Sequence, residues 1–138
     1  MILVSACLAG VNCRFDGSSK VNEKIVELIK EGKAIPVCPE QLAGLPTPRK
    51  PVECTFDGKV LSKNGEDFTD FFNKGAKETL SLCNLYNCKK VILKSNSPSC
   101  GSNQIYDGGF SGKLIDGNGI TAKLLKENGI EVVSEKEL

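Results

Sequence analysis

Short apolar runs rich in β-branched residues alternate with helix-forming segments along this chain of 138 residues. Near-continuous apolar character is typical of parallel strands that are buried on both faces. Strands that alternate with helices favour a parallel sheet with helices on both of its faces. We therefore predict an α/β fold, a three-layer sandwich with a mainly parallel four-stranded sheet. The predicted strands are Ile2–Ala6, Ala34–Val37, Lys90–Lys94 and Ile130–Ser134.

Three segments carry helix signals. Asn22 is suited to cap a helix whose apolar residues follow at helical spacing, and Gly32 provides the stop. A longer helix is predicted over Phe68–Leu85, and another over Gly119–Asn128 with Gly129 after it. The buried stripe of the longer helix is predicted to contain Phe72, Ala76, Leu80 and Cys83.

The remaining segments lack helical or apolar character. Gly44–Pro51 holds three of the six prolines and is predicted to be an irregular surface loop. Glu53–Gly65 contains an Asp57-Gly58 turn between alternating residues, which favours a small hairpin. Asn96–Gly117 is rich in Gly, Ser and Asp and is predicted to be an extended loop. Because no repeat or linker interrupts the chain, we predict one domain over residues 1–138.

Composition and charge narrow the class of protein. Hydrophobic residues make up 40% and charged residues 25%, the balance of a globular protein, and the formal net charge is only +1. No apolar run has the length of a membrane span, and the opening MILVSACLAG lacks the basic lead and cleavage site of a signal peptide. We expect a cytoplasmic protein that binds neither a nucleic acid polymer nor a membrane. The sequence leaves open whether it is a monomer or a dimer.

The chain contains seven cysteines and no histidine. An odd number of cysteines cannot all pair within one chain, and nothing signals export to an oxidising compartment. Such cysteines are buried hydrophobes, nucleophiles or metal ligands. The lack of histidine excludes a Cys-His catalytic pair and a mixed Cys/His zinc site. A metal centre in this chain must therefore be held by thiolates, with carboxylates or an open position.

Three of the cysteines follow predicted strands. Cys7 follows the first strand, Cys38 follows the second, and Cys100 lies in the loop after the third. Because ligands bind beyond the carboxyl ends of parallel strands, we expect these thiols to meet in a metal site with an open position. The sequence leaves the part of Cys13 open, and the spacing does not settle the kind of metal centre. Structural roles are predicted for Cys54, Cys83 and Cys88.

Polar residues flank these cysteines. Glu40 lies two residues after Cys38 and is a candidate general base in a chain without histidine. The turn around Ser97 offers hydroxyl and backbone N–H groups to an anionic ligand or a thiolate. Solvated loop charge and an ordinary turn are the alternative interpretations. The candidates for orienting a polar, planar substrate are Arg14, Asp16 and Arg49.

Four stretches of the chain resemble a known family. They are SACLAGVNCRFDG from Ser5, PVCPEQLAGLPTPR from Pro36, LKSNSPSCG from Leu93 and YDGGFSGKLIDGNGITAKLL from Tyr106. In this order they are similar to a small bacterial family of domains of unknown function that includes the thiouracil desulfurases. The resemblance extends from Met1 to about Leu125, which is nearly the whole chain.

The resemblance implies a [4Fe-4S] cluster held by Cys7, Cys38 and Cys100, with one iron open to the sulfur of a small thiolated substrate. It implies non-redox, hydrolytic cleavage of the C–S bond with release of sulfide, in which the open iron polarises the C=S group. Ser97 and Glu40 are the nearest candidates for activating water and protonating the product. Because oxygen strips exposed clusters, we expect some aerobic preparations to contain zinc, or no metal at all, in place of the cluster.

The chain departs from the family pattern at a few positions. Ala9 and Ala43 stand where many members carry Leu and Gly, and Phe15 replaces a common Tyr. The carboxylate attributed to the desulfurases falls near Glu40, either at that residue or at the position of Leu42.

Two other functions use the same thiols. One is a non-catalytic protein that binds a metal or carries a cluster. The other is a thiol redox protein in which Cys7 and Cys13 form a reversible disulfide. Single cysteine replacements separate these hypotheses from the desulfurase.

Overall fold

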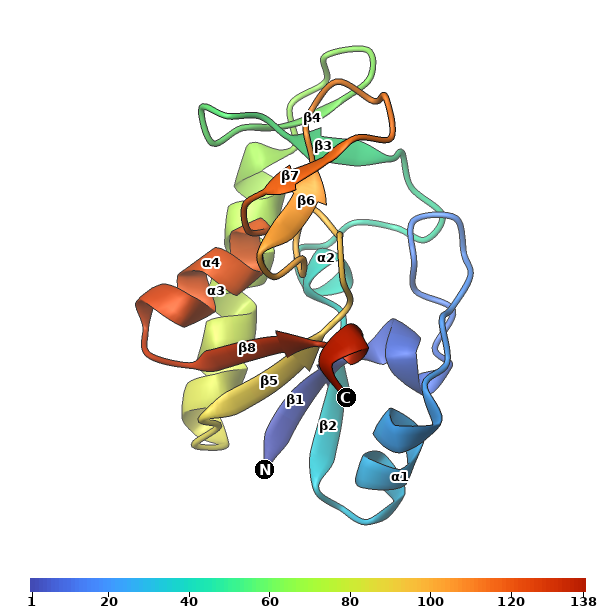
Figure 1. Ribbon diagram of the computed structural model, residues 1–138, viewed down its shortest axis with the longest axis vertical. Helices are drawn as coiled ribbons and strands as arrows, with labels where there is room; N and C mark the ends of the chain where they lie inside the picture. Colours follow the sequence, from blue (N-terminus) through green and yellow to red (C-terminus); the bar gives the residue numbers. More distant parts are fainter.

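The computed structural model describes residues 1–138 and contains a sheet of four parallel strands in the order β2-β1-β5-β8 (Figure 1). Val4 in the central strand β1 pairs with Pro36 on one side and with Ile92 on the other. The four predicted strands are confirmed, but Ala6, Lys94 and Ile130 lie just outside them, and Ala6 starts the short 3-10 helix η1. The bounds are β1 Ile2–Ser5, η1 Ala6–Ala9, β2 Ala34–Val37, β5 Lys90–Leu93 and β8 Glu131–Ser134.

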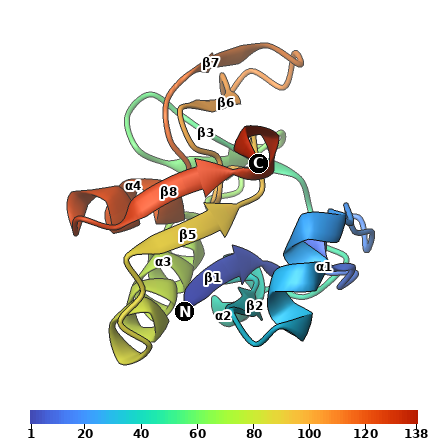
Figure 2. The ribbon, with the colours of Figure 1, turned by 60° about the horizontal axis from the view of Figure 1, so that its bottom comes forward.

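Helices cover both faces of the sheet, as predicted (Figure 2). Because side chains alternate along a strand, neighbours in β1 enter different cores. Leu3 packs in the core that contains Cys83 and Leu125 of the two C-terminal helices, whereas Val4 packs with Ile25 of the first helix. The helices are α1 Glu23–Lys30, α3 Thr69–Leu85 and α4 Ile120–Glu127.

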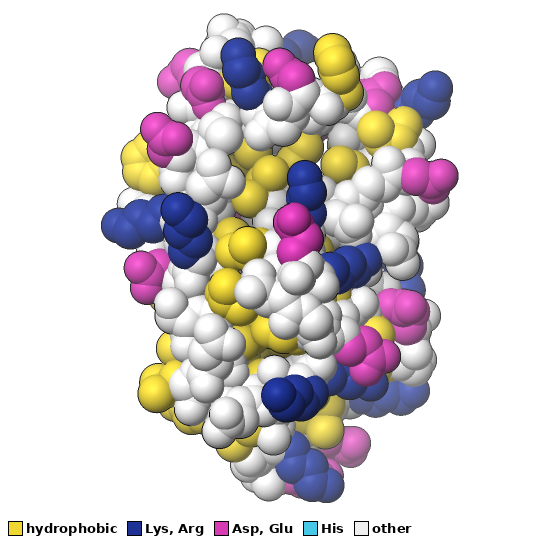
Figure 3. Space-filling model, turned by 90° about the vertical axis from the view of Figure 1, so that its left-hand side faces the viewer, with side chains coloured by type: hydrophobic (Ala, Val, Ile, Leu, Met, Phe, Trp, Pro, Cys, Tyr) yellow, Lys and Arg dark blue, Asp and Glu magenta, His cyan; other side chains and the backbone are white.

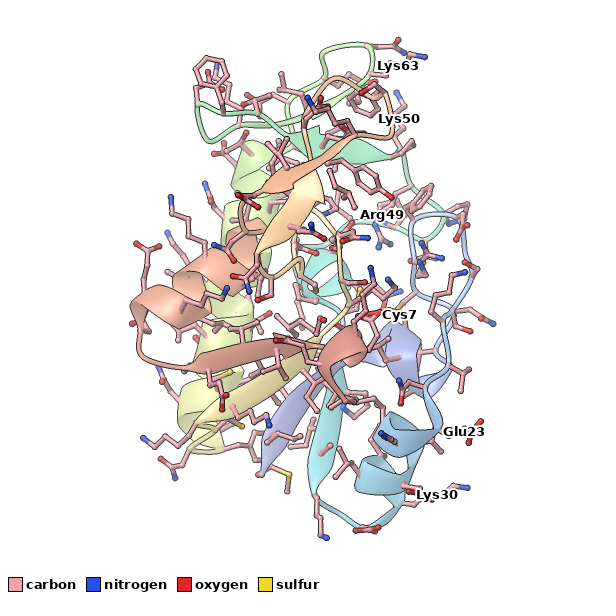
Figure 4. All side chains as sticks on the ribbon, viewed as in Figure 1. Cys7, Glu23, Lys30, Arg49, Lys50 and Lys63 are labelled. Atoms are coloured by element: carbon pink, nitrogen blue, oxygen red, sulfur yellow. The ribbon has the colours of Figure 1, made fainter.

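The first helix begins at the residue that the sequence signals predicted, and its capping contact is the expected one. The side chain of Asn22 accepts a hydrogen bond from the backbone N–H of Lys24 at 3.0 Å and so caps α1. Ile25 is fully buried. Glu23 and Lys30 lie at opposite ends of the helix (Figure 4), where their charges complement the helix dipole.

Two small hairpins lie beyond the carboxyl edge of the sheet (Figure 1). The first pairs β3 (Val52–Cys54) with β4 (Val60–Ser62) and confirms the predicted hairpin. The second pairs β6 (Gln104–Tyr106) with β7 (Leu114–Asp116), so the prediction of an extended loop over residues 96–117 is wrong. These strands have three residues each and are anchored by the buried Ile105. The many Gly, Ser and Asp residues around Ile105 made the segment resemble a loop in the sequence.

A short helix, α2 (Pro39–Leu42), follows β2 and was not predicted. Pro39 occupies its first position, where proline lacks only a donor that the helix does not use. Gly75 of α3 lies at the contact between the two helices. A Cβ atom at this position would overlap the carbonyl oxygen of Pro39 and lie 3.3 Å from Cβ of Ala43. Gly75 therefore sets how closely α2 approaches α3.

Gly75→Ala is expected to lower the free energy of unfolding by roughly 1–3 kcal/mol, the cost of overpacking. At an open helix position the same change gains about 1 kcal/mol, so the sign tests the close approach. Chemical denaturation of both proteins measures the difference. Asn73→Ala, on the exposed face of α3, is the matched control and should leave stability unchanged or slightly raised. A more stable Gly75→Ala protein would contradict the described packing.

The surface shows no concentration of one charge on the face seen in Figure 3, where acidic and basic side chains are interspersed. This agrees with the formal net charge of +1. None of the helices combines the length and the apolar character needed to cross a bilayer.

Candidate metal centre

A cavity of about 380 Å³ lies at the carboxyl edge of the sheet. Its lower wall comes from residues at the ends of β1, β2 and β5, and its upper wall comes from the two hairpins. The strand order places β2 and β5 on opposite sides of β1. In open α/β sheets, a point where successive connections leave on opposite sides forms a crevice that binds ligands.

Four thiols line this cavity. They belong to Cys7, Cys13, Cys38 and Cys100, and all seven cysteines of the chain are free. The structure thus brings the three cysteines that follow strands to one cavity and adds Cys13 to them. The Cys38 thiol lies 3.8 Å from the carbonyl oxygen of Cys13, to which it can donate. The sequence left Cys13 open because its loop has no regular structure that would fix its direction.

The other three cysteines lie outside the cavity. Cys83 and Cys88 belong to the core between the sheet and the helices α3 and α4. Cys54 is buried under the hairpins, and its thiol donates to the carbonyl oxygen of Pro98 at 3.3 Å. Each side chain fills a core position, in agreement with the structural roles predicted for these residues.

Two of the cavity thiols, those of Cys38 and Cys100, have pKa values raised above the ordinary value of a thiol. Burial raises the pKa of Cys100 to about 12, although hydrogen bonds from Ser5 and Ser99 oppose the shift. The pKa of Cys38 is raised well above the ordinary value of a thiol by the interaction of Cys38 with the Cys13 thiol and by burial. Metal ions bind the deprotonated thiolate, so loading this site with metal must release protons.

The donor set fits an iron–sulfur cluster better than a single metal ion. No three of the Cys, Asp and Glu side chains are arranged to hold one ion. The thiols instead surround a cavity whose volume falls in the range of about 300–1,000 Å³ that is common for ligand sites. Cysteine thiolates are the usual ligands of iron–sulfur clusters. The residues present therefore fit a thiolate-bound cluster with room for a small ligand.

The carboxylate of Glu40 is held by two partners in the cavity wall. Arg49 Nε donates to Glu40 Oε1 at 2.9 Å, and Ser99 Oγ donates to Glu40 Oε2 at 2.8 Å. The Arg49 and Glu40 side chains are only 6% and 14% exposed, so this ion pair is largely shielded from solvent. The prediction for Arg49 was contact with substrate, but its donors are directed at protein acceptors.

Arg49 also ties Glu40 to the thiol loop. Its Nη2 donates to the carbonyl oxygen of Cys13 at 2.8 Å, and its Nη1 donates to Thr47 Oγ1 at 2.9 Å. In Figure 4, Cys7 and Arg49 lie between the edge of the sheet and the hairpins. The guanidinium thus connects the loop after β1 to the helix after β2.

A chain of hydroxyls runs from Ser97 to Glu40. Ser97 Oγ accepts the backbone N–H groups of Ser99 at 3.1 Å and of Cys100 at 3.0 Å. It lies 3.0 Å from Ser99 Oγ, which in turn donates to Glu40. The two predicted acid/base residues are therefore linked through Ser99, which sequence reasoning missed. The repeated serine in Ser97-Pro98-Ser99 was the available signal.

The remaining predicted residues differ in their relation to the cavity. Arg14 lines it and has no carboxylate partner; its guanidinium lies 5.9 Å from the centre of the Phe15 ring. Asp16 is not among the lining residues, and its carboxylate accepts hydrogen bonds from Ser18 in its own loop. The geometry thus keeps Arg14 as a candidate for substrate binding and gives no support to Asp16.

Aromatic rings in the upper part of the cavity were also missed. The rings belong to Phe15, Tyr106 and Phe110. Tyr106 and Phe110 come from the second hairpin, and the prediction of a loop there offered no reason to expect them near the strand ends. They add apolar, planar groups to a cavity whose other functional residues are thiols and charged side chains.

Comparisons with known proteins agree with this geometry. The model of the 2-thiouracil desulfurase family matches residues 2–137. The uncharacterized protein YbbK of Bacillus subtilis (strain 168) is 49% identical over 147 residues, which cover 100% of this chain and 97% of that protein.

A solved structure, the [4Fe-4S]-dependent thiouracil desulfidase TudS, is similar with a TM-score of 0.95 and 45% sequence identity. The match covers 99% of this chain and 91% of that chain. Sequence and fold therefore agree over almost the entire length, and the resemblance predicted from the four motifs is confirmed. The protein belongs to the 2-thiouracil desulfurase family.

Proposed function

We propose that this protein is a [4Fe-4S]-dependent desulfurase that removes sulfur from a thiolated nucleobase such as thiouracil, or a similar small thioamide, and releases sulfide. One observation carries the proposal. In a member of the desulfurase family, Cys7, Cys38 and Cys100 leave three different strand ends and line one cavity. Thiols that surround a cavity of this kind suit a cluster that must also admit a substrate.

The cluster would be held by Cys7, Cys38 and Cys100, with Cys13 as a neighbouring fourth thiol. Three protein ligands leave one iron of a cubane open, and a bound cluster supplies a Lewis acid for the sulfur of a thiocarbonyl group. The overall reaction is hydrolysis, in which C=S and water give C=O and hydrogen sulfide. No electron acceptor or donor is needed.

The protein residues move the protons of this hydrolysis. Glu40 accepts a proton from the attacking water, and Arg49 and Ser99 fix the direction of its two carboxylate oxygens. Ser97 Oγ already accepts two backbone N–H groups, so its own hydrogen is free for donation to Ser99 or to a ligand in the cavity. The proton taken from water is returned to the departing sulfur.

Arg14 and the aromatic residues would orient the substrate. Arg14 has no carboxylate partner, and of its guanidinium nitrogens only Nη1 is engaged, by a hydrogen bond of 3.5 Å to Ser18 Oγ. Its other donors are available to a carbonyl oxygen or another polar edge of a planar ring. The hairpin rings offer an apolar surface to the faces of that ring.

Protein purified without oxygen is expected to be brown and to contain about four irons and four acid-labile sulfides per chain, the composition of a cubane cluster. Incubation with thiouracil should release sulfide and form uracil in equal amounts. Iron and sulfide analysis, the visible spectrum and chromatography of the products measure these quantities. Colourless protein that cannot be reconstituted would reject the iron–sulfur mechanism. A stable cluster without turnover of any thiolated base would favour the non-catalytic alternative.

A further inference from the structure

We infer that the hairpin formed by β6 and β7 is the specificity element of the cavity, with Phe110 stacking on the ring of the substrate and Glu53 as its positioning residue. The inference rests on the proposed function, because it assigns the part of the site that recognises a planar base. It goes beyond the cluster and the acid/base residues, since it concerns residues that reach the cavity from the opposite wall.

Glu53 ties the two hairpins together. It lies in β3 and lines the cavity, and its Oε1 accepts the backbone N–H of Gly108 at 3.0 Å and that of Phe110 at 3.2 Å. One carboxylate oxygen thus holds two amides of a loop more than fifty positions away, at sequence separations of 55 and 57. A charged acceptor makes stronger hydrogen bonds than a neutral one, so the loop is fixed at this point.

Two residues of the loop have positive φ angles, and for one of them this conformation is uncommon. Phe110 has a φ of 56°, in the left-handed region that bulky residues rarely occupy. Gly108 has a φ of 92°, and a Cβ there would lie 2.9 Å from the carbonyl oxygen of Cys54. Uncommon backbone conformations persist where the surroundings fix them, and they occur often at sites that clamp ligands.

Phe110 has no structural role that would account for this arrangement. It lines the cavity and belongs to none of the hydrophobic cores of the molecule. The thiols come from the edge of the sheet, whereas Phe110 comes from the hairpin above that edge (Figure 1). An aromatic residue on the hairpin side of the cavity is suited to stack on a planar base, and the sheet edge remains free for chemistry.

Phe110→Ala is expected to raise the KM for thiouracil about tenfold or more, the loss typical of a base–aromatic stack. The kcat and the iron content should stay unchanged, because Phe110 is neither a proposed cluster ligand nor a proposed acid/base residue. Calorimetry should show the same weakening for uracil, which binds without reacting. Phe110→Tyr retains the ring and should restore most of the affinity.

A matched control is available in the neighbouring hairpin. Phe56 is fully exposed and does not line the cavity, so Phe56→Ala should leave KM, kcat and the uracil affinity unchanged. Glu53→Ala should raise KM without lowering kcat, whereas Glu53→Gln keeps an acceptor oxygen and should have a smaller effect. A purely structural role would instead lower thermal stability while leaving KM unchanged.

The inference and the proposed function fail in different ways. Unchanged KM and unchanged uracil affinity in Phe110→Ala would overturn the inference and leave the desulfurase intact. Binding of uracil or thiouracil that depends on Phe110, in a protein that releases no sulfide, would support the inference and reject the proposed function.

Discussion

Cys38→Ser is expected to abolish both the bound iron and the release of sulfide, and Cys7→Ser and Cys100→Ser should do the same. Each of these cysteines follows a different strand, so each substitution removes one of the three proposed ligands from its own side of the cavity. A serine hydroxyl is a poor iron ligand because it does not ionise near neutral pH, whereas the cluster requires thiolates. Iron content, acid-labile sulfide and visible absorption of proteins purified without oxygen provide the measurement.

Two buried cysteines serve as controls for this experiment. Cys54→Ser and Cys83→Ser alter thiols outside the cavity, so iron content and turnover should remain near those of the unmodified protein. A Cys38→Ser protein that retains a full cluster would contradict the proposed ligand set. Cys13→Ser separates the redox alternative, which requires function without iron and its loss when Cys13 alone is changed.

Glu40→Gln is expected to lower kcat by about 10²- to 10⁴-fold, the usual contribution of a positioned acid or base. The amide is close in size to the carboxylate and can still accept a hydrogen bond from Ser99, but it cannot take a proton from water. Iron content should therefore stay unchanged while sulfide release falls. Steady-state sulfide release, with the iron content of the same samples, measures both quantities.

The control for Glu40 is another carboxylate in an ion pair. Glu66 pairs with Lys50 on the surface, its side chain is 47% exposed, and it does not line the cavity. Glu66→Gln should leave kcat within a factor of about two, as expected for an exposed pair. Retention of full turnover by Glu40→Gln and Ser97→Ala together would reject the acid/base assignment and leave the cluster proposal standing.

Local patterns predicted the sheet because each strand is a continuous apolar run with a helix signal nearby. Ile92 and Val132, for example, lie in runs of β-branched residues, which indicate a buried strand, and both are buried. The hairpin of β6 and β7 was missed because its strands have three residues each and its stability comes from Ile105, which packs on residues of the other hairpin. Such distant contacts leave no periodic signal in a single segment.

The same distinction holds in the candidate site. The positions of Cys7, Cys38 and Cys100 after strands were enough to predict a shared edge, because strand ends of a parallel sheet meet there. The pairing of Glu40 with Ser99 was not predictable, since Ser99 is 59 residues away and nothing in the sequence distinguishes it from the other serines of the chain. The sequence therefore predicted which residues share the cavity better than it predicted their hydrogen-bond partners.

The two walls of the cavity are built from different kinds of structural element. The lower wall consists of strand ends from a sheet buried on both faces, whereas the upper wall consists of two-stranded hairpins at the surface. The proposed cluster ligands thus come from the edge of the sheet, whereas the proposed stacking residue comes from a hairpin. Substitutions in the hairpin can therefore change substrate preference without altering the strand ends that carry the thiols.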